Sequence, residues 1–349
     1  MKIKNRLFIL SCLLGLKLSA QDIHFSQFYM APLNQNPAMA GALHDIEAIA
    51  NYREQWKSVA QPYKTTACSY SMRLNKANNK KGYWAGGLNF FNDKAGDGQL
   101  ATFQASLNAA YHVHTGQYST LGIGLQGGYA QRSVDYSALT WGNQYDGITY
   151  NQLLPGREPV NASAHKGYAD AGAGLVWTYN NTAGLINVTD NHDLKMNLGF
   201  SVLHVNQPAS SFYATADHLY MKYVLHGKAT ISIKNTRMAL VPGFMAYRQV
   251  SLSQLYIGSL FRYALQQESK YTANKNGTAF SIGAFLRLKD AVSIPFLLEY
   301  DHYSIGLSYD VNISKLNTAS TGRGGFELSF RFVGPGAFGN SAKARYNLN

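Results

Sequence analysis

Four neighbouring Asp and His pairs are the residues of this sequence best suited to hydrolytic chemistry, because a carboxylate beside an imidazole can support a general base. They are His44-Asp45, His192-Asp193, Asp217-His218 and Asp301-His302. Adjacent residues of a β-strand point to opposite faces, so no such pair can form a dyad within a strand. All four pairs also fall near predicted strand ends or turns. We therefore predict no catalytic residues and do not expect an enzyme.

Two other patterns could in principle bind a metal ion. Residues 93–98 (DKAGDG) are spaced like the start of a calcium loop, but Ala95 replaces the middle ligand and Gln104 stands where the last glutamate is required. His112 and His114 share a predicted strand face, and two ligands are too few for a site without help. We expect a hairpin turn and interfacial histidines, and predict no metal or other cofactor.

The glycines at 122, 124, 127 and 128 superficially suggest a phosphate loop. They lie inside an alternating strand, and no Lys-Ser or Lys-Thr follows them. We expect glycine kinks that let a curved sheet bend.

The elements that would position all these residues show a period of two. Apolar residues occupy one face and small polar residues mostly the other in 102–112, 194–202 and 303–314. A helix would scatter both sets around its circumference, whereas a strand separates them. The second face is small and polar rather than charged, as expected of a wet or plugged lumen. A soluble sandwich would instead have a charged outer face.

We predict an all-β fold, a transmembrane antiparallel up-and-down β-barrel of about fourteen strands over residues 46–333. Spans of about ten residues suit tilted membrane strands, and an even strand number is expected of single-chain bacterial barrels. The strands are predicted at 46–58, 64–74, 83–92, 99–113, 119–134, 168–180, 193–205, 218–233, 236–249, 253–266, 277–288, 291–300, 302–313 and 324–333.

Residues 1–20 have the pattern of a secretory signal peptide, with a basic start, a short apolar run at 7–16 and Ala20 before the expected cleavage. A lipoprotein signal ending at Cys12 is the alternative. Residues 21–45 form a leader, and 334–349 form a C-terminal tail. No later segment has eighteen consecutive apolar residues, so we expect no transmembrane helix.

Composition and charge exclude several classes of function. Charged residues make up only 14% of the chain, against about 25% in average proteins, and Tyr and Gly are abundant, which suits a barrel. The net charge is +12, of which four charges lie in residues 1–20. The rest are dispersed, which argues against nucleic acid and for lipid head groups or an acidic partner. Cys68 alone remains after signal removal, so no internal disulfide can form.

The connections suggest an orientation. If the first strand starts in the periplasm, the two longest outward connections are 135–167 and 206–217, and tight turns such as 234–235 and 301–302 face the periplasm. The longer connections at 181–192 and 267–276 then also face the periplasm, which is an exception to this asymmetry. Exposed aromatic residues often anchor protein interfaces. The candidate partner-binding residues in the outward loops are Trp141, Tyr145, Tyr150, Phe212 and Tyr213. The alternative for 135–167 is a self-packed lid.

The leader is rich in aromatic residues yet is neither a clear strand nor a clear helix, because Pro32 and Pro37 break both. We predict that it folds into the lumen as a plug or lies across the periplasmic mouth. A disordered leader is the alternative. The candidate contacts are His24, Phe25, Phe28 and Tyr29.

Several motifs follow one another in a fixed order along the chain. They are DIHFSQFY at 22–29 with PL at 32–33, NPA at 36–38 and AG at 40–41, YREQW at 52–56, GIGLQGGY at 122–129, GFS at 199–201 with HVNQP at 204–208, IGLSYDV at 305–311 and GFEL at 325–328. This ordered set resembles the PorP/SprF family of type IX secretion system outer-membrane proteins of Bacteroidetes-type bacteria.

The resemblance implies a non-catalytic outer-membrane protein that docks, or helps to export and retain at the cell surface, a secreted protein such as a gliding adhesin. The implied partners are a secreted type IX substrate or its C-terminal domain, other secretion components and outer-membrane lipid. The alternative function is a diffusion porin for small solutes, because a fourteen-strand barrel has a lumen unless it is plugged.

Overall fold

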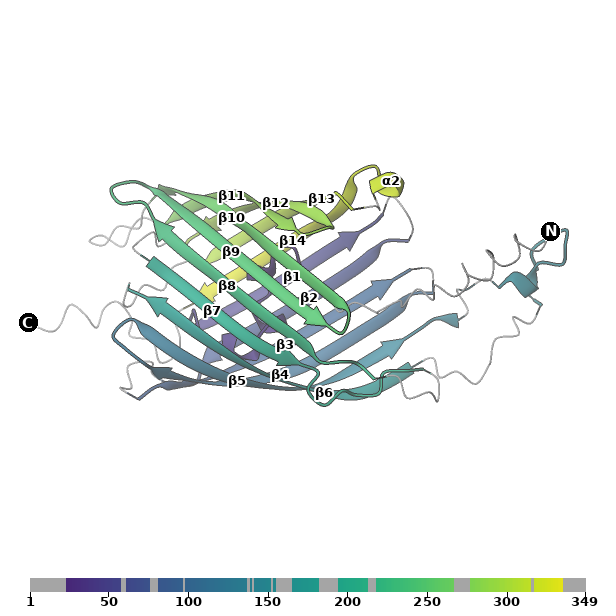
Figure 1. The fold of residues 1–349 in the computed structure, drawn as a ribbon, viewed down its shortest axis with the longest axis horizontal. Coiled ribbons are helices and arrows are strands. Elements are labelled where there is room, and N and C mark those ends of the chain that lie inside the picture. Colours follow the sequence, from purple (N-terminus) through teal and green to yellow (C-terminus); the bar gives the residue numbers. More distant parts are fainter. Residues whose placement is uncertain are drawn as a thin grey trace, which may run out of the picture.

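Fourteen antiparallel strands close into a barrel in the computed structural model of this chain (Figure 1). Each strand pairs with the next along the sequence, and the last pairs with the first. The structure describes residues 23–57, 61–75, 81–96, 98–136, 139, 141–151, 153–154, 165–181, 194–212, 218–266, 277–314 and 317–334. No helix among them is long and apolar enough to cross a membrane.

The strands are long, as expected of tilted barrel staves. Their bounds are β1 (Ile46–Gln55), β2 (Tyr63–Arg73), β3 (Tyr83–Ala95), β4 (Leu100–His114), β5 (Ser119–Ser133), β6 (His165–Asn180), β7 (Leu194–Leu203), β8 (Lys222–Ser232), β9 (Met238–Gln249), β10 (Leu252–Gln266), β11 (Thr278–Arg287), β12 (Ala291–Tyr300), β13 (Tyr303–Asn312) and β14 (Arg323–Gly334).

The predicted fold class is confirmed, and the differences are local. β1 stops three residues earlier than predicted, because Trp56 has a φ of 57°, which takes the chain out of the strand. β8 begins at Lys222 rather than at 218, because His218 instead pairs with Ala209 in the preceding connection. The predicted signal peptide and nearly all of the predicted tail lie outside the described residues.

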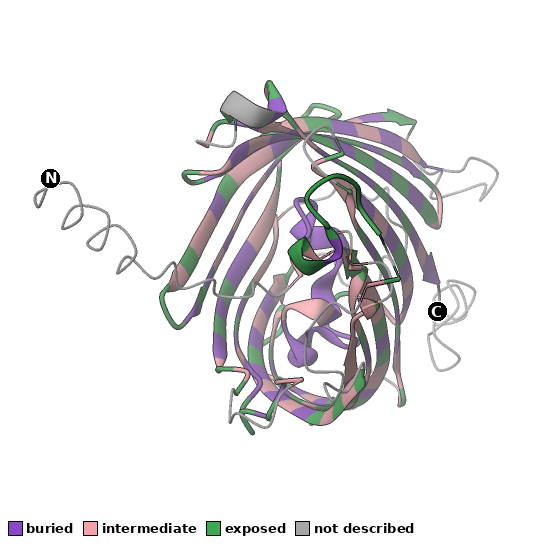
Figure 2. Cartoon of the chain, turned by 90° about the vertical axis from the view of Figure 1, so that its right-hand side faces the viewer, coloured by how far each residue is buried: buried purple, intermediate pink, exposed green. Residues whose placement is uncertain are grey.

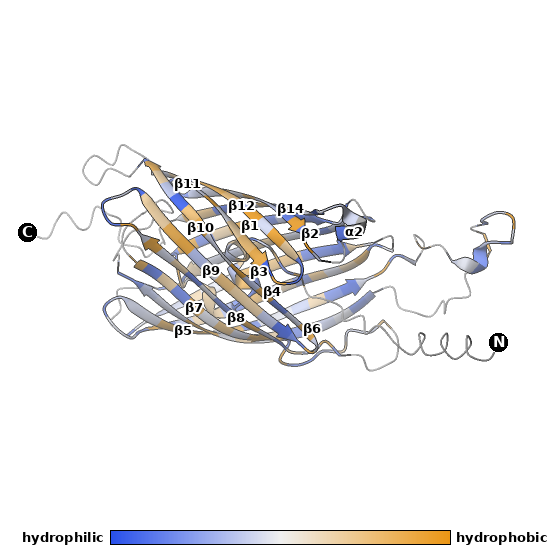
Figure 3. Ribbon diagram, turned by 45° about the horizontal axis from the view of Figure 1, so that its top comes forward, coloured by the Kyte–Doolittle hydropathy of each residue, from blue (hydrophilic) through white to orange (hydrophobic). Residues whose placement is uncertain are grey.

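The two faces of each strand differ as the alternation predicts. On β4, Leu107 is 66% exposed on the outer surface, whereas its neighbours Ser106 and Asn108 are buried. Figure 3 shows hydrophobic positions recurring along β9, β10 and β12. Apolar residues on the outside suit contact with lipid, and polar residues inside a barrel suit a filled or wet lumen.

The barrel has two unlike ends. The turn end is where β1 begins, and it carries the short connections at 233–237 and 301–302. The loop end is where β1 ends, and it carries the connections between β5 and β6 and between β7 and β8, together with the short helix α2 (Asn317–Ser320). In Figure 1 the loop end lies to the right.

The described part of the leader, residues 23–45, lies inside the ring of strands (Figure 2). It forms three short 3-10 turns, η1 (Phe28–Met30), η2 (Pro32–Asn34) and η3 (Pro37–Met39). Pro32 and Pro37 each begin a turn, where their fixed φ and missing N–H are tolerated. The leader runs from the loop end to the turn end before β1 begins.

One wall of the lumen is apolar, whereas the sequence predicted small polar residues on the inward face of the strands. Inward residues of β7 to β12 surround η1 and form the largest cluster of buried apolar side chains. Its members are Phe28, Tyr29, Met30, Leu203, Val224, Val241, Met245, Tyr247, Tyr256, Leu260, Phe285 and Leu297. Because η1 covers most of this wall, most of its apolar surface is removed from water, which stabilises the folded leader.

Candidate functional site

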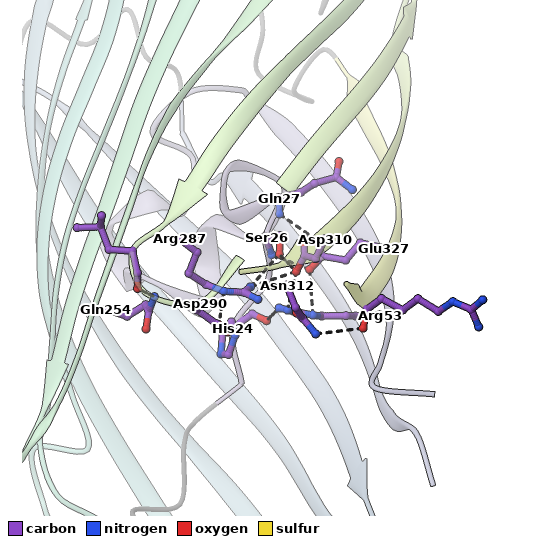
Figure 4. Close-up of polar contacts among 12 residues, drawn as sticks. His24, Ser26, Gln27, Arg53, Gln254, Arg287, Asp290, Asp310, Asn312 and Glu327 are labelled. Carbon is purple, nitrogen blue, oxygen red and sulfur yellow. Dashed lines mark hydrogen bonds and ion pairs between the residues drawn. The ribbon is translucent and has the colours of Figure 1, made fainter. Parts of the chain in front are cut away.

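Charged side chains from four strands meet the leader inside the barrel, near the loop end. Together with Ser26 and Gln27 they form the latch cluster, whose charged members are Arg53 of β1, Arg287 of β11, Asp310 of β13 and Glu327 of β14. Figure 4 shows these side chains converging on Ser26 and Gln27. Strand pairing places them at one level, since Arg53 lies opposite Glu327 across the β1–β14 seam.

The charges of the latch cluster are paired. Arg53 reaches both carboxylates, with Nη2 3.1 Å from Oδ2 of Asp310 and Nε 3.2 Å from Oε1 of Glu327. Nη1 of Arg287 lies 3.1 Å from the same Asp310 oxygen, and its Nε lies 2.5 Å from Oδ2 of Asp290. Arg53 is completely buried, so its carboxylate partners must replace the interactions with water that its guanidinium group has lost.

The leader completes the latch cluster. The backbone N–H groups of Ser26 and Gln27 donate to the two oxygens of Glu327, at 2.6 and 2.9 Å. The Ser26 hydroxyl donates to Oδ2 of Asp310 at 2.6 Å and accepts from Arg287 at 3.1 Å. Arg53 also donates to the carbonyl oxygen of His24. Hydrogen bonds to charged groups are the stronger ones, so this arrangement holds a polypeptide segment in place.

Asn36 anchors the middle of the leader. Its side-chain oxygen accepts from the N–H of Ala38 at 2.9 Å, capping η3, and its amide nitrogen donates to the carbonyl oxygen of Leu175 at 2.8 Å. Ser201 donates to the carbonyl oxygen of Gln35. These bonds tie the leader to β6 and β7, on the opposite side of the barrel from β14.

Glycines make room for this segment. A Cβ at Gly124 would lie 2.3 Å from the backbone nitrogen of Ala38, and one at Gly174 would lie 1.9 Å from the side-chain oxygen of Asn36. These distances give Gly124 and Gly174 a role beyond the bending expected of the glycines in β5. Gly124 allows the leader to approach the strand.

The four leader residues singled out from the sequence all lie against barrel strands. Phe25 packs on Ala67, and the Phe28 ring meets the Phe285 ring edge-on at 5.5 Å. The His24 ring lies 6.2 Å from the Tyr256 ring. Tyr29 is buried, and its carbonyl oxygen accepts from Arg331 at 2.6 Å.

The loop residues singled out from the sequence are not one group. In the 141–151 segment Tyr145 is 56% and Tyr150 45% exposed, whereas Trp141 is half-buried. The Tyr150 hydroxyl donates to the side chain of Gln144 at 2.8 Å. Gln144 thus holds the loop together. Two aliphatic side chains outside the candidate set are more exposed, Ile148 at 86% and Leu153 at 93%.

The remaining loop candidates lie between β7 and β8. Phe212 is half-buried, with the guanidinium carbon of Arg132 5.6 Å from its ring centre. Tyr213 lies outside the described residues.

The structure describes two of the four Asp and His pairs in full, His44-Asp45 and Asp301-His302, together with His218. Asp45 pairs with Arg73 at 2.5 Å, and Nε2 of His302 lies 3.7 Å from the carboxylate of Asp301. His192, Asp193 and Asp217 lie outside the described residues. His218 contacts the carbonyl oxygen of Gln207 at 2.8 Å through Nδ1. No group of three or more His, Cys, Asp or Glu within the described ranges could hold a metal ion.

A buried acid–imidazole pair does exist, but its members are far apart in the sequence. Nδ1 of His204 lies 2.8 Å from the carboxylate of Asp170, which also accepts from Gln104 at 3.1 Å. In the sequence, only the inward position of Asp170 on a stretch of β6 that is otherwise small and apolar could have indicated this pair.

The sequence of this chain matches one family over nearly its whole length. The model of the family described as "Type IX secretion system membrane protein PorP/SprF" matches residues 17–332. No protein with a curated description is similar enough to match.

Solved outer-membrane barrels are similar only in outline. The CymD monoaromatic hydrocarbon channel is 10% identical, with 87% of this chain and 93% of that chain covered and a TM-score of 0.44. A FadL homologue from Pseudomonas aeruginosa is 9% identical, with 85% and 92% covered and a TM-score of 0.43. BamA from Haemophilus ducreyi, lacking POTRA domains 1–3, is 8% identical, with 83% and 70% covered and a TM-score of 0.42. The closed ring of strand pairs defines the barrel independently of these structures.

Proposed function

Because this chain belongs to the PorP/SprF family of type IX secretion system membrane proteins, we propose that it is a plugged barrel that docks a secreted protein at the cell surface. It is an outer-membrane protein of that system, and the family implies contact with other secretion components. The finer role is to accept or retain a secreted substrate or its C-terminal domain, by binding alone. One observation carries this proposal: the leader occupies the lumen and is bonded on opposite sides.

The filled lumen favours docking over diffusion. A porin needs a continuous wet path, and its inward polar side chains would be solvated. Inward polar residues such as Gln104, Ser106 and Asn108 are buried instead, and so are Ser26 and Gln27 of the leader. A closed barrel leaves the loops, rather than the pore, to act on another molecule.

The loop end offers a surface for such a partner. Tyr145, Ile148 and Leu153 expose apolar area on a loop that its own hydrogen bonds hold in shape. Apolar anchors on a preorganised loop favour tight binding, because little ordering entropy is lost on association. We assign the docking role to these three residues, with Trp141 and Tyr150 supporting the loop.

Mild-detergent purification of the tagged full chain from its own cells, followed by mass spectrometry, tests the function. We expect a large secreted protein to co-purify in comparable amount. Recovery of the barrel alone, together with a stable open conductance in planar bilayers, would reject docking and favour the porin alternative.

A further inference from the structure

The leader does not fill the turn end of the barrel completely. A cavity of about 320 Å³ remains between η1–η3 and the turn-end halves of the strands. We call it the turn-end chamber. It extends to the rim of the barrel at Gln117 and Tyr118, which are both exposed. Its volume lies at the lower end of the range for small-molecule sites, which is about 300–1,000 Å³.

The turn-end chamber is strongly basic. Its lining contains one carboxylate, Glu299, and five cationic side chains. These cations are Arg73, Lys195, Lys228, Arg262 and Arg331. Three of them have carboxylate partners, since Arg73 pairs with Asp45 at 2.5 Å, Arg262 with Glu299 at 2.6 Å and Arg331 with Glu47 at 3.2 Å.

Lys228 is different from those three. Within the described part of the chain, no carboxylate lies within 4.0 Å of the Lys228 ammonium group. This group lies 5.0 Å from the ring centre of Tyr29. Arg331 donates to the carbonyl oxygen of the same Tyr29 at 2.6 Å. Two cations therefore meet at one leader residue, and an anion would relieve their mutual repulsion.

A neighbouring imidazole is affected by the same charges. Desolvation lowers the pKa of His44 well below its ordinary value, and Arg331, Lys195 and Arg73 act in the same direction. His44 lines the turn-end chamber. Its neutral form adds no charge of its own to the chamber.

Part of the lining of the turn-end chamber is apolar. Phe28 and Met39 of the leader and Val241, Leu260 and Leu297 of the strands contribute to it. A bare inorganic ion would make no use of this surface. A ligand with one anionic group and a compact apolar body would contact both the cationic and the apolar lining residues.

We propose that the turn-end chamber binds a small organic anion, whose carboxylate or phosphate group lies between Lys228 and Arg331 and whose apolar body packs on Leu260 and Leu297. The leader and the latch cluster lie between the chamber and the loop end. The ligand therefore enters from the turn end, which is the periplasmic side in the orientation predicted from the loops. This proposal is independent of the docking function.

Calorimetric titration of the full chain in an uncharged detergent tests this site. The probes are benzoate, phenyl phosphate, neutral benzamide and inorganic phosphate. We expect saturable binding of benzoate or phenyl phosphate, and at least about tenfold weaker binding of benzamide, since a hydrogen bond to a charged group contributes that much. Inorganic phosphate should also bind less tightly than phenyl phosphate. No saturable binding of either organic anion, or equal binding of benzamide, would overturn the proposal.

Two lysines of β8 provide a matched pair of variants. Lys228→Met should weaken binding of the organic anions by about tenfold, and Lys228→Arg should restore most of it. Lys222 also faces inward and stands 4.9 Å from the ring centre of Tyr247, but it does not line the turn-end chamber. Lys222→Met should therefore bind as the parent does. Unchanged affinity in a folded Lys228→Met barrel would contradict the assignment.

Discussion

Ser26 and Glu327, separated by 301 positions in the sequence, are joined by a hydrogen bond of 2.6 Å from the backbone nitrogen of Ser26 to the Glu327 carboxylate. Glu327 lies on β14, the strand that closes the barrel against β1. The hydrogen bonds from the leader to Glu327 can therefore form only when the last strand is in place. These bonds link the position of the leader to the closure of the barrel.

Glu327→Gln should destabilise the folded barrel substantially. The change keeps the side-chain shape but leaves Arg53 with one carboxylate partner in a dry site, where breaking an ion pair costs about 3–5 kcal/mol. Glu54→Gln is the matched control, because its partner Lys57 is 3.9 Å away and largely exposed, and such surface pairs contribute about 0–1 kcal/mol. Urea unfolding measures both. Equal midpoints for the two variants would show that the latch cluster is not stabilising.

Gly124→Ala should disturb the leader without disturbing β5 itself. The new methyl group would meet the backbone nitrogen of Ala38, and overpacking of this kind costs about 1–3 kcal/mol. Gly127→Ala lies on the same strand with no heavy atom within 4 Å of its Cβ position, so it should be neutral. Hydrogen exchange of residues 23–45 is the measurement. Faster exchange of residues 23–45 in both variants, or in neither, would contradict a close contact between the leader and Gly124.

The fold could be predicted from the sequence because alternation is local. Within each strand the alternation alone separates an apolar face from a polar face. The strand predicted at 302–313, which the structure shows as β13, therefore required no knowledge of its neighbours. Strand ends were less certain because they depend on turn geometry, as Trp56 illustrates with its positive φ.

The latch cluster could not be found in this way. Arg53, Asp310 and Glu327 lie on three different strands, and their meeting depends on the closure of the barrel. Their inward parity was visible in the sequence, but nothing local distinguishes a lumen charge that pairs with a leader from one that faces water. The apolar patch on β7 to β12 was missed for the same reason.

Docking should depend on the exposed tip of the loop rather than on aromatic residues in general. Ile148→Ser with Leu153→Ser should reduce surface retention of the secreted partner by at least about tenfold, as expected when apolar anchors are lost. Tyr118→Ala, an exposed aromatic residue at the turn end, should leave retention unchanged. Fractionation of cells and medium measures retention. Full retention by the double variant would remove this loop from the docking surface.

The path of the leader predicts which side of the membrane each of its ends faces. Residues 24–27 lie at the loop end and His44 lies at the turn end. In a Cys68→Ser background, Ile23→Cys should react with a membrane-impermeant maleimide on intact cells, whereas His44→Cys should not. The reverse pattern would mean that the leader, or the whole barrel, is oriented the other way.

Single-channel conductance of the purified barrel tests the central claim most directly. With the leader seated, the full chain should be closed in planar bilayers, and a variant lacking residues 23–41 should conduct while still migrating as a folded barrel on gels. A full chain that conducts as an open fourteen-strand pore, or a folded deletion variant that stays closed, would contradict the claim that the leader plugs the lumen.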